Sequence, residues 1–375
     1  MALIAIEAAR PNRRQKTGTE WYGYHVIQQM KKIADPREDR FILYSNSPLH
    51  SGLEKMPNKS WREKELGWLL PRFWTQGRLS FEMLINPPDV LYVPAHAMPI
   101  IHPKKTVVTL HDVGFERFPE LYSKPDLWYH RWSAKYVISQ AAKIITVSHF
   151  SKNELIELYA APAEKIHVTH LGFDSDRYKA IDNQDKIDRV LEKYNIKKPY
   201  IFYIGRLEKK KNIPLLVEAF GRYKRQNKPD EHRLVLVGRP GFEYEKIKES
   251  VKRYDLADWV IEPGWVPEED IPYLYNGATC FAFPSRYEGF GIPLLEAMAT
   301  ETPILASRAA SIPEVAGDAA LYFQTDDIES LVANLRAILR DEVLRDQLRK
   351  NGRKRARAFS WEKTAKNTLD ILKSV

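Results

Sequence analysis

Short apolar runs alternate with amphipathic helical patterns along almost the whole chain. Several runs are apolar at every position, which is typical of strands covered by helices on both faces of a sheet. This alternation predicts an α/β fold with doubly wound parallel sheets. The runs read "ALIAIEA", "RFILYSN", "DVLYVPA", "TVVTLHD" and "KIITVSH" in the first half, and "YIFYIGR", "HRLVLVG", "WVIEPGW", "CFAFPS", "PILAS" and "ALYF" in the second.

The pattern occurs twice, and a chain of 375 residues is long for one domain, so we expect two Rossmann-like domains. Their parallel sheets would face a central cleft at the carboxyl ends of the strands, where open α/β sheets bind ligands. We expect an N-terminal domain over residues 1–173, a linker over 174–198, a second domain over 199–357, and a C-terminal helix over 358–375 that packs back on the first domain.

Composition narrows the classes of partner. The formal net charge of +9 allows nucleic acid, an anionic membrane surface or a phosphorylated substrate. The single cysteine, Cys280, excludes a disulfide within the chain and fits a reducing cytoplasm. The N-terminal apolar run is too short for a signal peptide, and no run approaches the ~18 apolar residues of a membrane span.

The segment "YIFYIGRLEKKKNIPLLVEAF" places positive charge between a strand and a helix. Arg206 and Lys211 follow the strand, and Pro214 is suited to a first helical turn. Cations and free N–H groups at a helix start favour an anion, and a guanidinium beside an ammonium suits a diphosphate. Taken alone, this segment is explained equally well by a basic loop that faces solvent.

The stretch "SRYEGFGIPLLEAMATETPILAS" carries Glu288, a Gly-Phe-Gly turn and Glu296. We expect Glu296 in the first turn of a helix, where a carboxylate is as often structural as functional. Leu294 replaces the third glycine of a dinucleotide fingerprint, which disfavours hydride transfer. On a continuous helix the two carboxylates would lie ~12 Å apart, farther than the ~5–9.5 Å of a glycosidase pair.

Several motifs together resemble a known family. "EGFGIPLLEAMATETPILAS" resembles the E-x7-E signature of retaining, two-Rossmann-domain (GT-B) glycosyltransferases of family 4, and "GRLEKKKNIPLLVEAF" is similar to that family's phosphate-binding segment. "LVLVGRPG", "PGWVPEEDIPYLYNGATCFAFPSRYEG" and "FSWEKTA" also fit. The resemblance covers the second half densely and the first half more loosely, and "TLHDVGFERFP" looks most like mannosyltransferase members.

The resemblance implies roles for residues of the second half. Arg206 and Lys211 would hold the donor diphosphate and stabilise the leaving nucleotide without a metal ion. Glu296 would accept hydrogen bonds from the ribose hydroxyls, and Glu288 would contact the donor sugar. The remaining donor contacts would come from the backbone of Gly289, Phe290 and Gly291 and, in the base pocket, from Arg239 and Val266.

In the first half the resemblance points to two loops. His111 ends a strand where the family has a histidine near the transferring sugar, although a His-Asp pair can also hydrogen-bond within a turn. Gly18 would let a helix N-terminus approach the donor phosphates, and Thr19 is a plausible N-cap. A zinc site is not expected, because no Cys pair or His-x3–5-His grouping lies near acidic residues.

The stretch "GWLLPRFWTQGRLSFEML" mixes aromatic residues with Arg72 and Arg78. This mixture suits a bilayer interface and a lipid-linked acceptor, but it fits the core and rim of one helix equally well. No recognised nucleic-acid module accompanies it, so nucleic acid is not expected as a partner.

These features together predict a cytoplasmic, metal-independent, retaining hexosyltransferase of polysaccharide or lipopolysaccharide biosynthesis, in peripheral contact with the inner face of an anionic membrane. It would use no cofactor and would move mannose from GDP-mannose to a glycan or lipid-linked glycan. The alternatives are UDP-glucose or UDP-N-acetylglucosamine as the donor, and a non-catalytic module that binds nucleotide sugars.

Overall fold

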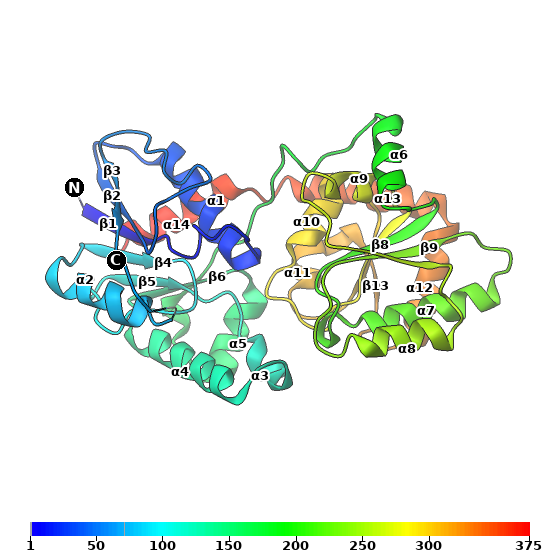
Figure 1. The fold of residues 1–375 in the computed structure, drawn as a ribbon, viewed down its shortest axis with the longest axis horizontal. Coiled ribbons are helices and arrows are strands. Elements are labelled where there is room, and N and C mark those ends of the chain that lie inside the picture. Colours follow the sequence, from blue (N-terminus) through cyan, green and yellow to red (C-terminus); the bar gives the residue numbers. More distant parts are fainter. Residues whose placement is uncertain (1, 71) are drawn as a thin grey trace. The chain divides into compact units, whose positions relative to one another are not determined.

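The computed structural model describes residues 2–70 and 72–375 and divides them into two compact units (Figure 1). The first unit comprises the chain up to Gly172 together with Trp361–Val375, and the second comprises Phe173–Ser360. Met1, the first residue of the expected N-terminal domain, and Pro71 lie outside the described residues. Each unit contains a parallel sheet with α-helices, which confirms the predicted fold class.

The first unit is built on a seven-stranded parallel sheet with the strand order β3-β2-β1-β4-β5-β6-β7. The strands are β1 (Ala2–Glu7), β2 (Asp39–Ser45), β3 (Trp61–Glu65), β4 (Val90–Val93), β5 (Thr106–Thr109), β6 (Lys143–Thr146) and β7 (Ile166–Val168). The helices are α1 (Gly18–Ile33), α2 (Ser80–Ile85), α3 (Gly114–Arg117), α4 (Lys124–Gln140), α5 (His149–Tyr159) and α14 (Trp361–Lys373).

Five of these strands match predicted apolar runs, whereas β3 and β7 were not predicted. Both lie at the edges of the sheet. The β3 sequence, "WREKE", is mostly charged and half-exposed, and β7 has only three residues. Edge strands are often short and charged because one side of the ladder is unpaired, so hydrophobic patterning does not reveal them.

The helix α1 begins one residue earlier than the predicted cap. Its N-cap is Thr17 and not Thr19, because Thr17 and Glu20 have the spacing of a capping box. The Glu20 carboxylate accepts the N–H of Thr17 at 3.1 Å. The C-terminal helix α14 packs against α1, where Trp361 and His25 stack with ring centroids 4.8 Å apart.

The second unit has a six-stranded parallel sheet with the order β10-β9-β8-β11-β12-β13. All six strands match predicted runs: β8 (Tyr200–Ile204), β9 (Arg233–Val237), β10 (Val260–Gly264), β11 (Cys280–Phe283), β12 (Ile304–Ser307) and β13 (Ala320–Phe323). The helices are α6 (Gln184–Lys193), α7 (Ile213–Gln226), α8 (Glu245–Arg253), α9 (Ile271–Gly277), α10 (Ile292–Ala299), α11 (Ile312–Ala316), α12 (Ile328–Arg340) and α13 (Glu342–Ala356).

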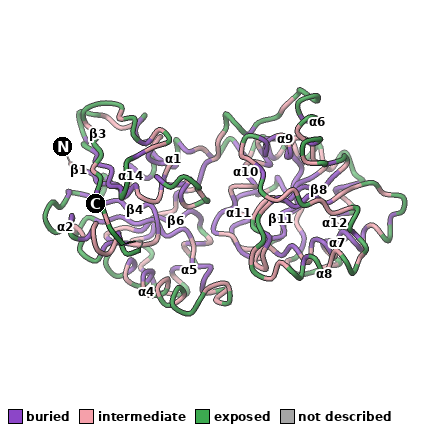
Figure 2. The backbone as a smooth tube through the Cα atoms, viewed as in Figure 1, coloured by how far each residue is buried: buried purple, intermediate pink, exposed green. Residues whose placement is uncertain are grey.

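Alternate residues of β8 explain why its sequence is apolar throughout. Ile201 and Tyr203 are buried in a core formed with α7, α8 and α12. On the opposite face, the Phe202 ring lies 4.9 Å from that of Tyr275 on α9. Both faces of the strand are therefore covered, as expected for the centre of a doubly wound sheet, and its first four residues are buried, within a largely buried sheet (Figure 2).

Residues 174–198, which we expected to be a linker, pack as part of the second unit. The helix α6 in this stretch buries Ile187 and Leu191 and packs against α9. The backbone N–H of Ile181 also donates to the Asn276 side chain at 2.8 Å. The polar composition of the stretch reflects the solvent face of an amphipathic helix and does not indicate a free connection.

The ends of β8 and β9 are in unusually close contact. A Cβ atom added at Gly238 would lie 1.8 Å from the Gly205 carbonyl oxygen, and both glycines have positive φ angles, +151° and +148°. Only glycine fits without backbone movement. This contact fixes where the chain leaves the central strand.

We therefore expect Gly238→Ala to lower the thermal unfolding midpoint by about 5 °C or more, because the clash and the backbone strain cost at least about 2 kcal/mol. Gly67→Ala is the control, since a Cβ there meets nothing within 4 Å. Differential scanning calorimetry measures both. Equal midpoints for the two variants would contradict the proposed constraint.

Candidate functional site

The strand order of the second unit reverses direction between β8 and β11. The chain moves from β8 to β9 on one side, and β11 pairs with β8 on the other. Ligands of open α/β sheets bind outside the carboxyl ends of the strands at such a switch point. The loops that follow these two strands carry Arg206, Lys211 and Glu288.

Lys211 and Glu288 form a direct ion pair. The Lys211 ammonium nitrogen lies 2.6 Å from Glu288 Oε1, and the side chains are only 18% and 12% exposed. Arg206 leaves the end of β8 with 68% of its side chain exposed, and its guanidinium lies 3.8 Å from Glu208. The loop after β8 therefore carries one cation shielded from solvent, Lys211, and one that faces solvent, Arg206.

A second set of contacts ties the two loops together. The Arg286 backbone N–H donates to the Lys210 carbonyl at 2.9 Å, and the Arg286 guanidinium donates to Asp326 at 2.7 Å. Asp326 also accepts from the Asn212 side chain at 3.0 Å. The three lysines of the "KKK" run are half-buried, so the run is not a fully solvated loop.

The Gly-Phe-Gly turn is hydrogen-bonded to a buried serine, Ser311. The Ser311 hydroxyl oxygen lies 2.9 Å from the carbonyl oxygens of both Glu288 and Phe290, which share its single proton. Phe290 is buried, and Gly291 has φ +103° and caps the N-terminus of α10. The turn is therefore a rigid connection between β11 and α10, and its Glu288 side chain is fixed relative to Lys211.

Glu296 differs in position from our prediction. The helix α10 begins at Ile292, so Glu296 is its fifth residue and lies beyond the first turn. Its Oε2 accepts the Tyr275 hydroxyl at 3.1 Å, and a second hydrogen bond comes from Tyr178. Burial raises the pKa of Glu296 to about 7, although both tyrosines favour the ionised form.

The two residues expected at a base pocket follow β9 and β10. The Arg239 side chain is exposed, while its carbonyl accepts the Leu207 N–H at 3.0 Å. Val266 is buried, and its neighbour Trp265 is 63% exposed. Trp265 was not among the predicted site residues; its place at the end of the predicted strand "WVIEPGW" is visible in the sequence, but its exposure is not.

His111 of the first unit is buried just after β5. Its Nε2 lies 3.0 Å from the Pro94 carbonyl oxygen, so this nitrogen carries a proton and donates. Burial lowers the pKa of His111, and its ring meets that of Tyr22 edge-on at 4.7 Å. His111 is therefore a neutral imidazole, while the adjacent Asp112 accepts the Gly114 N–H within the turn.

Gly18 is the first residue of α1 in the first unit. A Cβ added there would meet nothing within 4 Å, so no protein packing demands a glycine at this position. The open space is compatible with a ligand near the helix start, as the resemblance implies.

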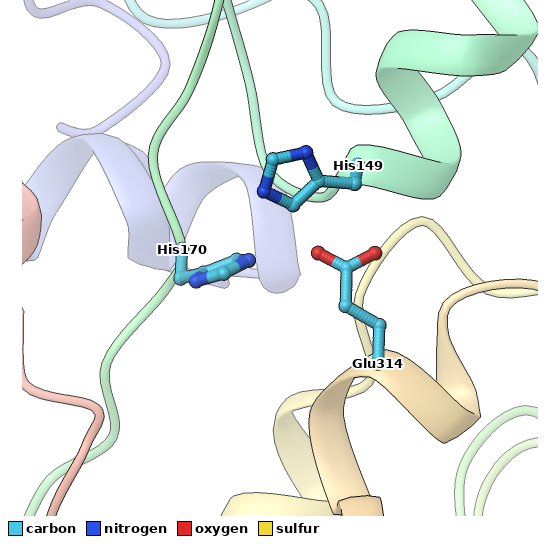
Figure 3. Close-up of side chains that lie close together, drawn as sticks. All are labelled: His149, His170 and Glu314. Atoms are coloured by element: carbon cyan, nitrogen blue, oxygen red, sulfur yellow. The ribbon is translucent and has the colours of Figure 1, made fainter.

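Two histidines not singled out from the sequence lie close together in the first unit. His149 starts α5 after β6, and His170 follows β7, with ring centroids 5.9 Å apart (Figure 3). They come from the carboxyl ends of neighbouring strands. Glu314, the third side chain labelled in Figure 3, belongs to α11 of the second unit, where its carbonyl accepts from Arg355.

Two family models match separate parts of the chain. The family described as "Glycosyltransferase Family 4" matches residues 45–177, and "Glycosyl transferases group 1" matches residues 184–355. An O-antigen chain mannosyltransferase B from Escherichia coli is 36% identical over 275 residues, which cover 72% of this chain and 70% of that protein. The chain belongs to the family 4 glycosyltransferases.

Two further similarities cover nearly the whole length of this glycosyltransferase. The O-antigen chain mannosyltransferase RfbU from Salmonella typhimurium is 26% identical over 85% of this chain and 87% of its own. The structure of a sucrose-phosphate synthase from Thermosynechococcus elongatus superimposes with a TM-score of 0.77 at 18% identity, covering 100% and 99% of the two chains. The latter supports the GT-B fold alone.

Within the part of this glycosyltransferase that the structure describes, no helix has both the length and the apolar character needed to cross a bilayer.

The environment of Glu296 predicts a pH dependence of stability. Its pKa is about 7 in the folded protein against a reference value of 4.5, so the folded state binds the extra proton between these values. The stabilisation that comes from protonating Glu296 in the folded state is fully present below pH 4.5 and is lost as the pH rises through 7. We expect Glu296→Gln to reduce the loss of unfolding free energy over this range.

Urea unfolding at several pH values measures this slope. The matched control is Glu249→Gln on the solvent face of α8, which should keep the wild-type slope. An unchanged slope for Glu296→Gln would show that this carboxyl titrates as an ordinary exposed group.

Proposed function

We propose that this glycosyltransferase moves mannose from GDP-mannose to a hydroxyl of a glycan or lipid-linked glycan, with retention of anomeric configuration and without a metal ion. The observation that carries the proposal is the partly buried ion pair between Lys211 and Glu288 at the switch point of the second sheet, which joins the loop that carries Arg206 to the loop after β11. The two O-antigen chain mannosyltransferases to which the chain is similar favour this sugar and a polysaccharide or lipopolysaccharide product.

In this proposal the second unit binds the donor diphosphate. Arg206 and Lys211 would contact its oxygens, and their charges would stabilise the negative charge that develops as the nucleoside diphosphate leaves. A planar guanidinium and a compact ammonium supply this stabilisation from the protein itself. The backbone N–H groups of Gly289, Phe290 and Gly291 would add hydrogen bonds around the sugar and phosphate.

Two carboxylates would hold the two ends of the donor. Glu296 would accept hydrogen bonds from the ribose hydroxyls, which are stronger to its ionised form. Glu288 would contact hydroxyls of the sugar while it neutralises Lys211. Arg239 and Val266 would border the base, and the exposed Trp265 ring offers a stacking surface next to them.

The resemblance to retaining members of the family supports retention, and the pairing of Glu288 with Lys211 argues against a covalent intermediate on this carboxylate. A carboxylate 2.6 Å from an ammonium is a weak nucleophile, because its charge is neutralised. We propose a front-face reaction in which the bond between the anomeric carbon and the phosphate oxygen breaks. The acceptor oxygen bonds to the same face, and its proton passes to the leaving phosphate.

In the first unit, His111 and Gly18 would take part in the same reaction. His111 would present a neutral imidazole held by Pro94, which suits hydrogen bonding to a sugar hydroxyl better than it suits proton abstraction. Gly18 would let the start of α1 approach the phosphates.

The reaction would take place in the cytoplasm at the inner face of the membrane. The single cysteine, Cys280, is a free buried thiol, which fits a reducing compartment.

We expect Lys211→Ala to lower the rate of mannosyl transfer at saturating donor by at least about a hundredfold, because it removes a cation aimed at the developing charge. Lys248→Ala, an exposed lysine on α8 of the same unit, is the matched control and should keep the wild-type rate.

The assay measures radiolabelled sugar transfer from GDP-mannose, UDP-glucose and UDP-N-acetylglucosamine in parallel. Transfer from a UDP-sugar alone would replace the proposed donor while keeping the site. A Lys211→Ala rate within a few-fold of wild type would contradict the site, and tight donor binding without transfer or hydrolysis would identify a non-catalytic module.

A further inference from the structure

Large apolar side chains are exposed along one stretch of the first unit. Of the thirteen exposed large apolar residues in the described chain, eight lie between residues 69 and 101. Leu69 is fully exposed and Phe73 is 62% exposed. Exposed apolar clusters of this kind mark surfaces that bind a partner or a membrane. We call them the apolar face: Leu69, Leu70, Phe73, Phe81, Leu84, Ile85, Ile100 and Ile101.

The helix α2 divides its residues between the core and this face. Phe81, Leu84 and Ile85 are exposed at i, i+3 and i+4, whereas Glu82 and Met83 are buried. The Ser80 hydroxyl at the start of α2 accepts the backbone N–H of Ile100 at 2.9 Å. The loop that carries Ile100 and Ile101 is thus tied to α2, which brings two of the exposed segments together.

Part of the aromatic stretch identified in the sequence is ordinary core. Trp74 is buried, and its indole N–H donates to the Leu66 carbonyl at 2.8 Å. The expected core and rim of one helix is wrong for Leu69, Leu70 and Phe73, which are solvent-exposed and precede the first helical residue, Thr75. Packing within the unit does not explain these three residues.

An aromatic row on α4 borders the apolar face. Trp128 stacks on Trp132 with centroids 6.4 Å apart, and Trp132 stacks on Tyr136 at 5.4 Å. The Tyr136 hydroxyl donates to the Ile100 carbonyl at 2.8 Å, which joins the row to the face. Tryptophan and tyrosine favour the boundary between lipid and water because their rings are apolar at one end and polar at the other.

The charges around the face are mainly positive. The carboxylate of α2, Glu82, is 1% exposed and paired with Lys64 and Arg78. On the same loops and along α4, six exposed cations outnumber two exposed carboxylates: Arg72, Lys104, Lys105, Lys124, Arg131 and Lys135 against Asp89 and Asp126. Such a rim attracts anionic headgroups, whereas a symmetric contact with a second copy would bring like charges together.

We propose that the apolar face docks on an anionic lipid bilayer. The leucine, isoleucine and phenylalanine side chains would enter the boundary between headgroups and acyl chains, and the basic rim would contact the headgroups. This inference deepens the proposed function and rests on it only for the lipid-linked acceptor. Docking itself requires neither donor nor turnover.

The test is co-flotation of the full chain with phosphatidylcholine vesicles that contain or lack phosphatidylglycerol, at two salt concentrations. We expect the wild type to bind the anionic vesicles at least tenfold more tightly than the neutral ones, and less tightly at high salt. Leu69→Gln/Leu70→Gln/Leu84→Gln should weaken binding at least tenfold with an unchanged unfolding midpoint. Val343→Gln, an exposed apolar residue in the second unit, is the control.

Equal binding of the triple variant and the wild type would overturn the proposal, as would equal binding to neutral and anionic vesicles. Loss of a dimer in the triple variant, without vesicle binding by the wild type, would instead identify the face as a contact between copies. A wild type that floats with anionic vesicles but transfers no sugar would uphold docking and contradict the proposed function.

Discussion

The ion pair between Lys211 and Glu288 is the interaction on which the site depends. It joins the loop after β8 to the loop after β11, and these are the strands on either side of the switch point. Asp326 accepts hydrogen bonds from Asn212 on the first loop and Arg286 on the second, and Ser311 donates to the backbone of the Gly-Phe-Gly turn. Lys211 and Glu288 are therefore held before a ligand binds, and little reorganisation of these two groups would accompany charge development.

The tyrosines around Glu296 give the site a second constraint. Tyr178 comes from the stretch that precedes α6, and Tyr275 comes from α9, so two separate segments converge on one carboxylate. Their hydroxyls favour its ionised form, while burial opposes it and raises the pKa to about 7. The balance leaves Glu296 sensitive to small changes of pH near neutrality.

The sequence predicted the two parallel sheets well because central strands covered on both faces are apolar at nearly every position. It did not predict β3, whose charged residues suit an edge, or the position of residues 174–198, whose polar side chains hide a packed helix. Lys211 and Glu288 were each singled out, but their pairing was not, because they lie 77 positions apart. Tyr178 carried no motif, and only its hydrogen bond to Glu296 reveals it.

The central claim is that these loops form a site for a nucleoside diphosphate, and the most direct measurement compares GDP with GMP as ligands in a thermal unfolding experiment. A ligand at 100 times its dissociation constant stabilises the folded state by about 2.7 kcal/mol. The account predicts that GDP raises the unfolding midpoint clearly, and that GMP, which lacks the second phosphate, does so far less. Equal shifts from both nucleotides, or none from either GDP or UDP, would contradict it.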